Sequence, residues 1–365
     1  MIPMNGFLRE PESLREQELA AVARVLRSGW YILGKEVQAF ESEWADIVGA
    51  SHAVDVGNGM DAIEIGLRAL GVGPGDEVIT TPMTAFASVL AVIRAGAEPV
   101  MADIDSMTAL MSIDSVKRCL GPKTRAVLLV HLYGQVDELE LWRKFCDEAG
   151  VHLIEDCAQA HLATWNGTRA GAVGVVGAFS FYPTKNLGAA GDGGALTTDI
   201  EDVAAKARQL RNYGQSDRYH HPKLGLNSRL DEVQAAILRV RLTVLEKFTQ
   251  RKKAIARAYR DGIDNPRIRL LAAPAQESSH VFHLFVVLCE ERDRLQKNLR
   301  DSGIESLIHY PIPVHLQPPC TGLRRDPRGL KSAERHGLTC LSIPCHPQLT
   351  DAEVASVIRA LNEFR

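Results

Sequence analysis

The sequence predicts an α/β protein with a largely parallel sheet and a smaller C-terminal domain. The first observation is that short apolar runs alternate with helix-length segments along most of the chain before Gly262, as strands and crossover helices do in a parallel sheet. The second is a change after Gly262, where prolines become more frequent and new strand signals begin. The third is the length of 365 residues, which is enough for two domains.

The composition is that of an ordinary globular protein, with 45% hydrophobic and 24% charged residues. A formal net charge of -3 leaves no basic excess for nucleic acid or for an anionic membrane surface. The N-terminus lacks an apolar signal core, and no segment has the apolar length of a membrane span. The seven cysteines are odd in number and contain no CxxC pair, which fits neither a disulfide framework nor a zinc site. We therefore expect a cytoplasmic protein without a metal, a membrane or a nucleic acid as partner.

The first predicted element is an amphipathic helix over residues 11–28, where Leu19, Val22, Ala23 and Leu26 recur at helical spacing. The apolar runs that follow are predicted to be buried strands because they are short and bounded by turn residues. They comprise residues 76–82, 98–105, 125–134, 152–158, 177–182 and 193–198.

A long helix is predicted from Leu230, since apolar residues then recur at helical spacing until Gly262. Helices of this length usually bridge two domains. We accordingly divide the chain into a large domain of residues 1–245 and a small C-terminal α+β domain of residues 246–365. Within the small domain, the apolar stretch 280–288 is predicted to be a strand.

The stretch VDVGNGMDAIEIGLRAL (54–70) predicts a phosphate site. A strand ends there in Gly57-Asn58-Gly59 and a helix begins at once, so free backbone N–H groups could bind a phosphate. A purely structural strand-to-helix turn explains this stretch equally well. The glycines at 191–194 match neither the Walker pattern nor GxGxxG, and they indicate a turn before a strand.

Two further segments carry candidate chemistry. In HLIEDCAQAH, a hydrophobic strand runs into Glu155 and Asp156, which places a carboxylate at the carboxyl end of a strand, where open α/β sheets bind ligands. Taken alone, a structural salt bridge explains this acid better. Lys185 follows the apolar FSFYP; a desolvated amine there would have a lowered pKa and act as a nucleophile, whereas most lysines are merely solvated surface charges.

Together these segments indicate a pyridoxal phosphate (PLP) site. A nucleophilic lysine, a strand-end aspartate and a helix N-terminus for a phosphate are the three parts that PLP needs. The aspartate keeps the pyridine nitrogen protonated, so that the ring withdraws electrons from the substrate carbon. The lysine binds the aldehyde and later moves a proton.

The motifs resemble those of the nucleotide-sugar aminotransferases of the DegT/StrS group. Lys185 follows Asp156 of EDCAQA by 29 residues and lies in FSFYPTKNLGAAGDGGAL. GNGMDAIEIGLRALGVGPGDEVI precedes this segment, and RNYGQSDRYHHPKLGLNSRLDEVQAAIL follows it. The resemblance extends from GWYILGKEVQAFE (29–41) to IHYPIPVHLQ (308–317) and so covers essentially the whole chain. It implies a fold-type I PLP enzyme that forms a homodimer with composite active sites.

The resemblance also implies roles for matching residues around the cofactor ring. Lys185 matches the lysine that binds PLP covalently, and Asp156 matches the partner of the pyridine nitrogen. Gln159 matches the residue that packs on one face of the ring, and Phe86 matches the aromatic residue on the other face.

For the phosphate, the resemblance implies contacts from both subunits. Ser180 matches a phosphate-binding hydroxyl, and Asn227 matches an asparagine that reaches the phosphate of the neighbouring subunit. Relatives usually carry threonine where this chain has Met60, so one hydroxyl contact is lost. The turn with Gly59 could still bind the phosphate through the backbone N–H groups of Met60 and Asp61.

Substrate choice follows from the same resemblance. The family mostly aminates keto sugars linked to a nucleoside diphosphate, with L-glutamate as donor and pyridoxamine phosphate as the carrier. Tyr182 stands where many C4 aminotransferases have histidine, and with His309 and Tyr310 it is similar to the branch that aminates dTDP-3-keto-6-deoxyhexoses. Core packing for Tyr182 and a structural hydrogen bond for His309 are the alternative explanations of these residues.

Other functions stay open. No sequence feature separates dTDP from UDP, and a C4 aminotransferase acting on a 4-keto sugar is the nearest alternative. A PLP-binding regulator without turnover is another, although no helix-turn-helix module is visible. Relatives that dehydrate deoxysugars replace the lysine with histidine, so Lys185 argues against a dehydratase.

Overall fold

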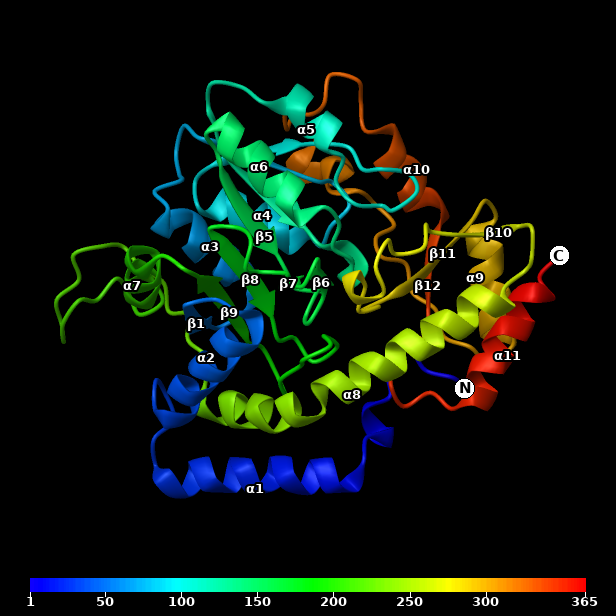
Figure 1. Cartoon of the computed structure of the whole chain (residues 1–365), viewed down its shortest axis with the longest axis horizontal. Coiled ribbons are helices and arrows are strands. Elements are labelled where there is room, and N and C mark those ends of the chain that lie inside the picture. The colour runs from blue at the N-terminus through cyan, green and yellow to red at the C-terminus, as the bar shows by residue number, and fades with distance from the viewer.

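The computed structural model describes residues 1–365 and contains two main sheets (Figure 1). The large sheet has seven strands in the order β1-β9-β8-β5-β4-β2-β3. Neighbouring strands from β8 to β3 pair in parallel, whereas β9 is antiparallel to both β8 and β1. The small sheet has the order β10-β11-β12 and is antiparallel. The predicted α/β fold, a mainly parallel sheet with a smaller C-terminal sheet, is thereby confirmed.

The strands are short. They are β1 (His52–Val56), β2 (Glu77–Thr80), β3 (Glu98–Met101), β4 (Thr124–Val130), β5 (His152–Asp156), β6 (Thr164–Trp165), β7 (Thr168–Arg169), β8 (Val176–Ser180), β9 (Gly194–Thr198), β10 (Ile268–Leu270), β11 (Phe285–Cys289) and β12 (Cys340–Ile343). The helices are α1 (Glu12–Ser28), α2 (Lys35–Val48), α3 (Gly59–Ala69), α4 (Phe86–Arg94), α5 (Ile113–Cys119), α6 (Leu139–Ala149), α7 (Glu201–Leu210), α8 (Glu232–Gly262), α9 (Arg292–Asp301), α10 (Lys331–Thr339) and α11 (Asp351–Asn362).

Helices cover both faces of the large sheet. Successive residues of β4 show the alternation: Val127 and Leu129 pack into one core with α2, α5, α6 and the start of α8. Ala126 and Leu128 pack into a second core with α3, α4 and α7. Because both faces are buried, the strands read as continuous apolar runs, and this is why the sequence pattern located them.

Each of the six predicted runs overlaps a strand, although β4 and β8 begin one residue before theirs. The predicted strand at 280–288 is only partly correct. β11 begins at Phe285. Phe282 has a φ of 47°, outside the extended region, and the backbone N–H of Val281 donates to the carbonyl of Gly134. Residues before Phe285 therefore pack against the turn after β4 instead of continuing the small sheet.

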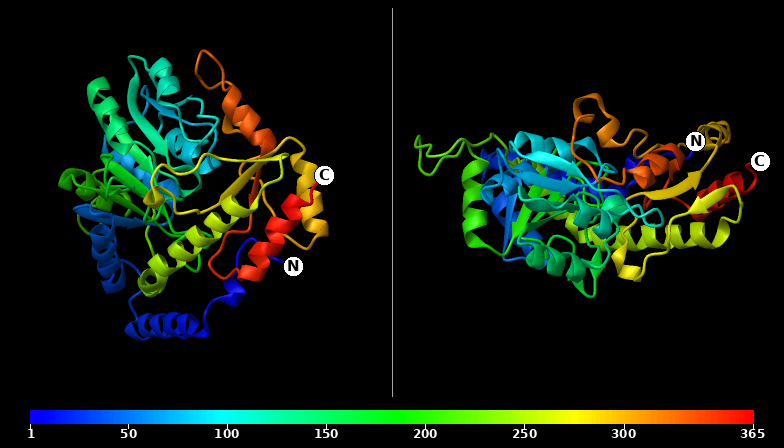
Figure 2. Two further views of the ribbon diagram at one scale, coloured as in Figure 1. Left: turned by 45° about the vertical axis from the view of Figure 1, so that its right-hand side comes forward. Right: turned by 90° about the horizontal axis from the view of Figure 1, so that it is seen from above.

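Helix α8 runs for 31 residues from the large sheet to the small one (Figures 1 and 2). It contacts α1 and α2 near its start and α11 further along. The first residues of the chain pack near its far end: Ile2 bridges to Ile304, and Arg9 pairs with Glu353 at 2.6 Å. The division of the chain at residue 245, within α8, stays a prediction. Neither α8 nor any other helix combines the length and the apolar character that crossing a bilayer requires.

Helix α1 lies along the outer side of α8, at the edge of the molecule (Figure 1). Ala21 and Val25 pack on Ala236 of α8. Leu19 and Leu26, which the spacing placed on the apolar face, are 63% and 56% exposed. The expectation that they are buried is therefore wrong within one chain. Helix α1 carries apolar residues on two sides, and α8 covers only the side with Ala21 and Val25.

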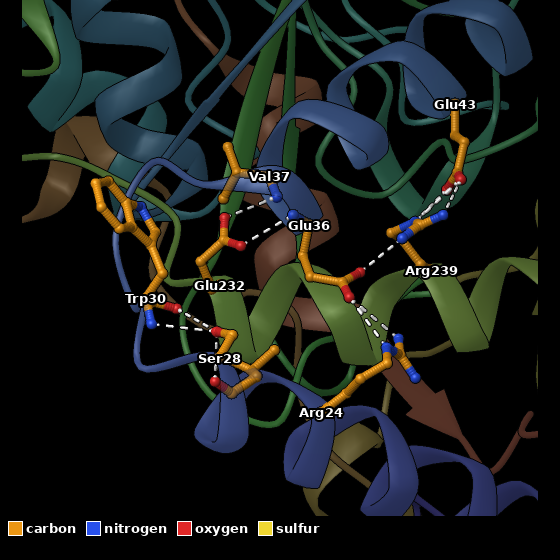
Figure 3. A network of polar contacts seen from close by, with 9 residues as sticks. Arg24, Ser28, Trp30, Glu36, Val37, Glu43, Glu232 and Arg239 are labelled. Atoms are coloured by element: carbon orange, nitrogen blue, oxygen red, sulfur yellow. Dashed lines mark hydrogen bonds and ion pairs between the residues drawn. The ribbon is translucent and has the colours of Figure 1, made fainter.

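The carboxylate of Glu232, at the start of α8, caps the N-terminus of α2 (Figure 3). It accepts hydrogen bonds of 2.8–2.9 Å from the backbone N–H groups of Gly34, Glu36 and Val37. The first N–H groups of a helix have no partner within it, and an anion there also interacts favourably with the helix dipole. A Cβ at Gly34 would lie 2.8 Å from this carboxylate, so glycine is required there.

We predict that Glu232→Gln destabilises the protein by about 2 kcal/mol, because an amide oxygen replaces a carboxylate that three buried N–H groups share. Urea unfolding followed by circular dichroism measures the change. Glu246→Gln, on an exposed site of the same helix, is the matched control and should leave the midpoint unchanged. Equal midpoints for the two variants would contradict the capping role.

Candidate active site

The carboxyl ends of neighbouring parallel strands bring the predicted catalytic residues together. Asp156 is the last residue of β5 and Ser180 the last residue of β8. The two strands pair in parallel, with Asp156 opposite Ala178. Lys185 lies in the loop that leaves β8, where its backbone N–H donates to the carbonyl of Tyr182 at 2.8 Å. The site therefore forms at the sheet edge where open α/β sheets bind ligands.

Asp156 is buried and held by hydrogen bonds on both oxygens. Oδ2 accepts from the hydroxyl of Ser88 at 2.7 Å, and that hydroxyl lies 2.7 Å from the hydroxyl of Thr84. Oδ1 accepts from the backbone N–H of Ala158 at 3.1 Å. Sequence reasoning missed Ser88 and Thr84, because no local pattern connects these two hydroxyl residues with Asp156.

Lys185 has an environment that favours its neutral amine. Burial lowers its pKa to about 8, the carboxylate of Asp156 opposes this shift, and the positive charge of Lys252 adds to it. A neutral amine is the nucleophilic form. Lys252, on α8, was not recognised from the sequence, because it looked like one more charge in a run of basic residues.

The predicted phosphate turn lies directly against Ser180. A Cβ on Gly59 would lie 2.6 Å from the Cβ of Ser180, so only glycine lets the start of α3 approach this closely. Asn58 caps α3 by accepting the N–H of Asp61 at 2.9 Å. The expectation that the N–H of Asp61 is free is therefore wrong. The N–H groups of Gly59 and Met60 remain, since the first positions of a helix have no partner within it.

Asn227 does not join this cradle within its own chain. The hydroxyl of its neighbour Ser228 donates to Asp61 Oδ2 at 2.7 Å and accepts from the N–H of Gly57 at 2.9 Å. Ser228 is therefore buried behind the turn, whereas Asn227 is exposed. The structure of one chain thus brings together Gly59, Met60 and Ser180 but not Asn227.

Gln159 and Tyr310 are linked across the site. Gln159 Oε1 accepts from the N–H of Tyr133 at 2.6 Å, and its Nε2 donates to the hydroxyl of Tyr310 at 3.3 Å. Burial, and then the charge of Asp156, raise the pKa of Tyr310 to about 12, so its phenol stays protonated. Phe86 is the first residue of α4 and is partly buried against the neighbouring core.

His309 and Tyr182 differ in how they are held. His309 Nδ1 lies 2.9 Å from the hydroxyl of Ser342, and burial together with the charge of Lys185 lowers its pKa to about 4. Its imidazole is therefore neutral at physiological pH. Tyr182 is 52% exposed, so core packing does not explain it.

A second acidic residue of the same strand, Glu155, has a structural environment. Its carboxylate lies close to His131 and Cys157, in a group that has the donor types of a metal site. It already accepts hydrogen bonds of 2.7–3.0 Å from the N–H groups of Gly171, Val173 and Gly174 and lies 2.8 Å from His131 Nε2. Burial raises the pKa of Cys157 well above its usual value, which keeps the thiol protonated and a poor ligand.

Comparisons with known proteins agree with the predicted family. A model of the DegT/DnrJ/EryC1/StrS aminotransferase family matches residues 12–362. The chain belongs to this family. It is therefore a PLP-dependent nucleotide-sugar aminotransferase, as the motifs predicted.

Three relatives show the extent of the similarity. The dTDP-3-amino-3,4,6-trideoxy-alpha-D-glucose transaminase of Streptomyces venezuelae is 44% identical over 363 residues, which cover 100% of this chain and 96% of that protein. The erythromycin biosynthesis sensory transduction protein EryC1 of Saccharopolyspora erythraea is 44% identical over 349 residues, 95% of each chain. The crystal structure of S. venezuelae DesV in complex with a ketimine intermediate superposes with a TM-score of 0.95 at 44% identity, covering 99% of this chain and 98% of that one.

The residues at the sheet edge fit the cofactor of the family, whose solved structures include PLP and pyridoxamine phosphate forms. The close approach of Gly59 to Ser180 puts helix N–H groups beside a hydroxyl, which suits a phosphate. Asp156 is a buried carboxylate suited to a protonated ring nitrogen, and Lys185 is an amine of lowered pKa suited to an aldehyde. When bound, PLP supplies an electron-withdrawing ring that stabilises negative charge at the substrate carbon.

We predict that covalent capture of PLP by the apoprotein at Lys185 rises with pH around a midpoint of about 8, instead of the ordinary lysine value of 10.5, because the amine must be neutral to react. Borohydride trapping at short times, followed by peptide mass spectrometry, measures the capture. Asp156→Asn should move the midpoint lower, since that carboxylate raises the pKa. Lys185→Ala, which should lose the adduct, is the control. A wild-type midpoint near 10.5 would refute this assignment.

Proposed function

We propose that the protein transfers the amino group of L-glutamate to the C3 keto group of a dTDP-linked 6-deoxyhexose. The products are 2-oxoglutarate and the dTDP-3-amino sugar. The observation that carries this proposal is the neutral imidazole of His309, which lines the same cavity as Lys185. Tyr182 is attached to the same loop, where its carbonyl accepts from the N–H of Lys185. The S. venezuelae transaminase, which is named for a dTDP-3-amino sugar, supports the choice of sugar carbon.

The roles of the protein residues follow from their environments. Lys185, with a pKa of about 8, accepts the proton from the α-carbon of the donor and returns a proton to the sugar carbon. Asp156, oriented by Ser88, would hold the proton on the pyridine nitrogen of the bound cofactor. Gly59 and Ser180 would hold the phosphate. Each of these steps moves a proton or positions a group, and none needs a metal.

Tyr182 and His309 would orient the sugar. Both can donate and accept hydrogen bonds, as is needed to place a keto group and its neighbouring hydroxyl. A polar site built around a substrate hydroxyl discriminates strongly when its groups are buried, because a misplaced sugar leaves them unpaired; here this applies to His309. The neutral state of His309 matters here, since Nδ1 is already engaged with Ser342 and only Nε2 remains for substrate.

A regulator without turnover is the second candidate, because EryC1 is named a sensory transduction protein. The lowered pKa of Lys185 and the hydrogen-bonded Asp156 favour catalysis, since a sensor needs neither a nucleophilic amine nor a positioned ring-nitrogen partner. Incubation of the PLP-loaded protein with L-glutamate separates the two functions. An aminotransferase releases 2-oxoglutarate in one equivalent per site, and a sensor releases none.

We predict that the wild type aminates a dTDP-3-keto-6-deoxyhexose, and that Tyr182→Phe and His309→Gln each slow the sugar half-reaction by about tenfold or more. Both variants should leave the glutamate half-reaction nearly unchanged. A panel of dTDP- and UDP-linked 3-keto and 4-keto sugars, with the amine position assigned by NMR, tests the proposal. An amine at C4 without turnover of 3-keto sugars would overturn the assignment of the carbon but leave the aminotransferase activity standing.

We also propose that the active protein is a homodimer whose sites combine residues of both chains. Figures 1 and 2 show the loop after α7 projecting from the body of the molecule. In this loop Tyr219 and Leu224 are 81% and 88% exposed. Asn227 at its end is also exposed, whereas its neighbour Ser228 contacts the phosphate turn of the same chain. The exposed Leu19 and Trp30 add an apolar surface that a second copy would cover.

We predict that Asn227→Ala lowers activity and that mixing it with Lys185→Ala restores part of it. In a mixed dimer one site combines the intact Lys185 of one chain with the intact Asn227 of the other. Activity after denaturation and refolding of the mixture is compared with that of each variant refolded alone. If Asn227→Ala is impaired and the mixture gains nothing, Asn227 acts within its own subunit.

A further inference from the structure

A cavity lies on the side of Lys185 that faces α8, between the loop after β8, the N-terminal segment and the small sheet. Its lining includes Lys185, Asn186, Thr249, Lys252, His283 and His346. His309, assigned above to the sugar, also lines this cavity, whereas the residues assigned to the cofactor ring and phosphate, among them Asp156 and Ser180, do not. The cavity is therefore an extension of the active site beyond the place where the cofactor would bind.

The cavity contains a buried positive charge that no carboxylate neutralises. Lys252 is 6% exposed, and its Nζ donates to two neutral oxygens, Asn186 Oδ1 at 3.0 Å and the carbonyl of His283 at 3.2 Å. The only carboxylate in the lining is that of Glu10, which is paired with Arg241 at 2.8 Å. A buried ammonium is costly unless an anion compensates it. Its surroundings thus favour an anionic ligand.

Three further polar side chains line the same cavity without partners in the chain. They are Thr249 through its hydroxyl, His283 through Nδ1 and His346 through Nε2. All three are more than nine-tenths buried. Buried polar atoms are nearly always hydrogen-bonded in folded proteins. Burial lowers the pKa of both histidines, so each ring is neutral and has one N–H. His283 can carry it on Nδ1 and donate to an oxygen ligand. His346 uses Nδ1 to donate to Gln348 Oε1 at 3.3 Å, so its Nε2 can only accept, for example from an ordered water.

We propose that this cavity binds the side-chain carboxylate of the amino donor, with Lys252 as its counter-ion and with Thr249 and His283 as hydrogen-bond donors. The proposal rests on L-glutamate as the donor in the proposed function. The α-carbon of the donor must lie at Lys185, which moves its proton, and the cavity begins at Lys185. The two methylene groups of glutamate then carry its second carboxylate away from the reacting carbon and into the cavity.

This arrangement explains how the enzyme would distinguish glutamate from other amino acids. A site built around a charged group rejects an uncharged analogue, because the buried partners are then left unpaired. Glutamine has nearly the same shape as glutamate but no charge on its side chain. The positive cavity should therefore favour glutamate over glutamine, and the preference should depend on Lys252.

Binding of glutarate to the PLP-loaded enzyme, measured by titration calorimetry, tests the proposal without turnover, because glutarate has two carboxylates and no amine. We expect Lys252→Met to weaken glutarate binding by at least about tenfold. Lys253→Met removes the same charge from the neighbouring residue of α8, outside the cavity lining, and should bind glutarate as the wild type does. Thr249→Val, which keeps the side-chain shape, should weaken binding by about two- to fivefold.

A second measurement separates anion binding from a purely structural role of Lys252. Asn186→Ser removes one neutral contact of Lys252 but keeps its charge, and should retain most of the glutarate affinity. In the half-reaction with amino acids, Lys252→Met should reduce the preference for L-glutamate over L-glutamine by about tenfold. Suppose that Asn186→Ser and Lys252→Met lose the same glutarate affinity and that the preference for glutamate over glutamine is unchanged. Lys252 would then only support the Lys185 loop.

The other outcomes are also decisive. Glutarate binding that is absent from the wild type or unchanged in Lys252→Met overturns the carboxylate site. Loss of dTDP binding in Lys252→Met with unchanged glutarate binding would assign the cavity to the diphosphate of the sugar instead. If the wild type forms no 2-oxoglutarate from L-glutamate, the proposed function fails. If it does and glutarate binding is insensitive to Lys252, only the donor site fails.

Discussion

The parallel pairing of β5 with β8 is the constraint on which the site depends. It brings the carboxyl ends of two strands to one edge of the sheet, so that Asp156 and Ser180 lie side by side although 23 residues separate them in the sequence. The turn at Gly59 can then approach Ser180 only because glycine has no side chain. These positions match PLP, whose ring nitrogen needs a carboxylate such as Asp156 and whose phosphate needs hydrogen-bond donors such as Ser180 and the turn at Gly59.

Burial affects the charged residues at this edge of the sheet as much as their hydrogen bonds do. Asp156 stays fixed by the Ser88 hydroxyl and a backbone N–H. Lys185 and Lys252 both have a pKa lowered to about 8, with burial as the largest cause. Burial disfavours the charged form of an amine, and so the neutral and charged forms of these two lysines are closer in free energy near neutral pH than in an ordinary lysine. That is the condition for a lysine that both reacts and transfers protons.

The sequence allowed us to predict the candidate site residues that lie at the ends of recognisable elements. Asp156 and Lys185 could be predicted because a strand signal or an apolar run immediately precedes each of them. The phosphate turn could be predicted because its glycines separate a strand from a helix. By contrast, Ser88, Ser228 and Lys252 act through partners far away in the chain, and no local pattern distinguishes them from ordinary hydroxyl or basic residues. The free N–H of Asp61 was misjudged because a cap by Asn58 requires a specific side-chain rotamer.

By itself, the sequence determined the α/β class, the approximate locations of the strands of the large sheet, and the family. Burial on both faces leaves continuous apolar runs, and long motifs surround the reactive residues. Tertiary structure decided which side of α1 is buried, where the strand at 280–288 begins and what lies behind Lys185. The physical reason is that each of these depends on which distant surfaces meet: α8 covers one side of α1, the turn after β4 binds the residues before Phe285, and Lys252 reaches Asn186 only after α8 packs against the loop. The spacing of apolar residues predicts a helix or a strand, whereas the fold decides which other element covers each of its faces.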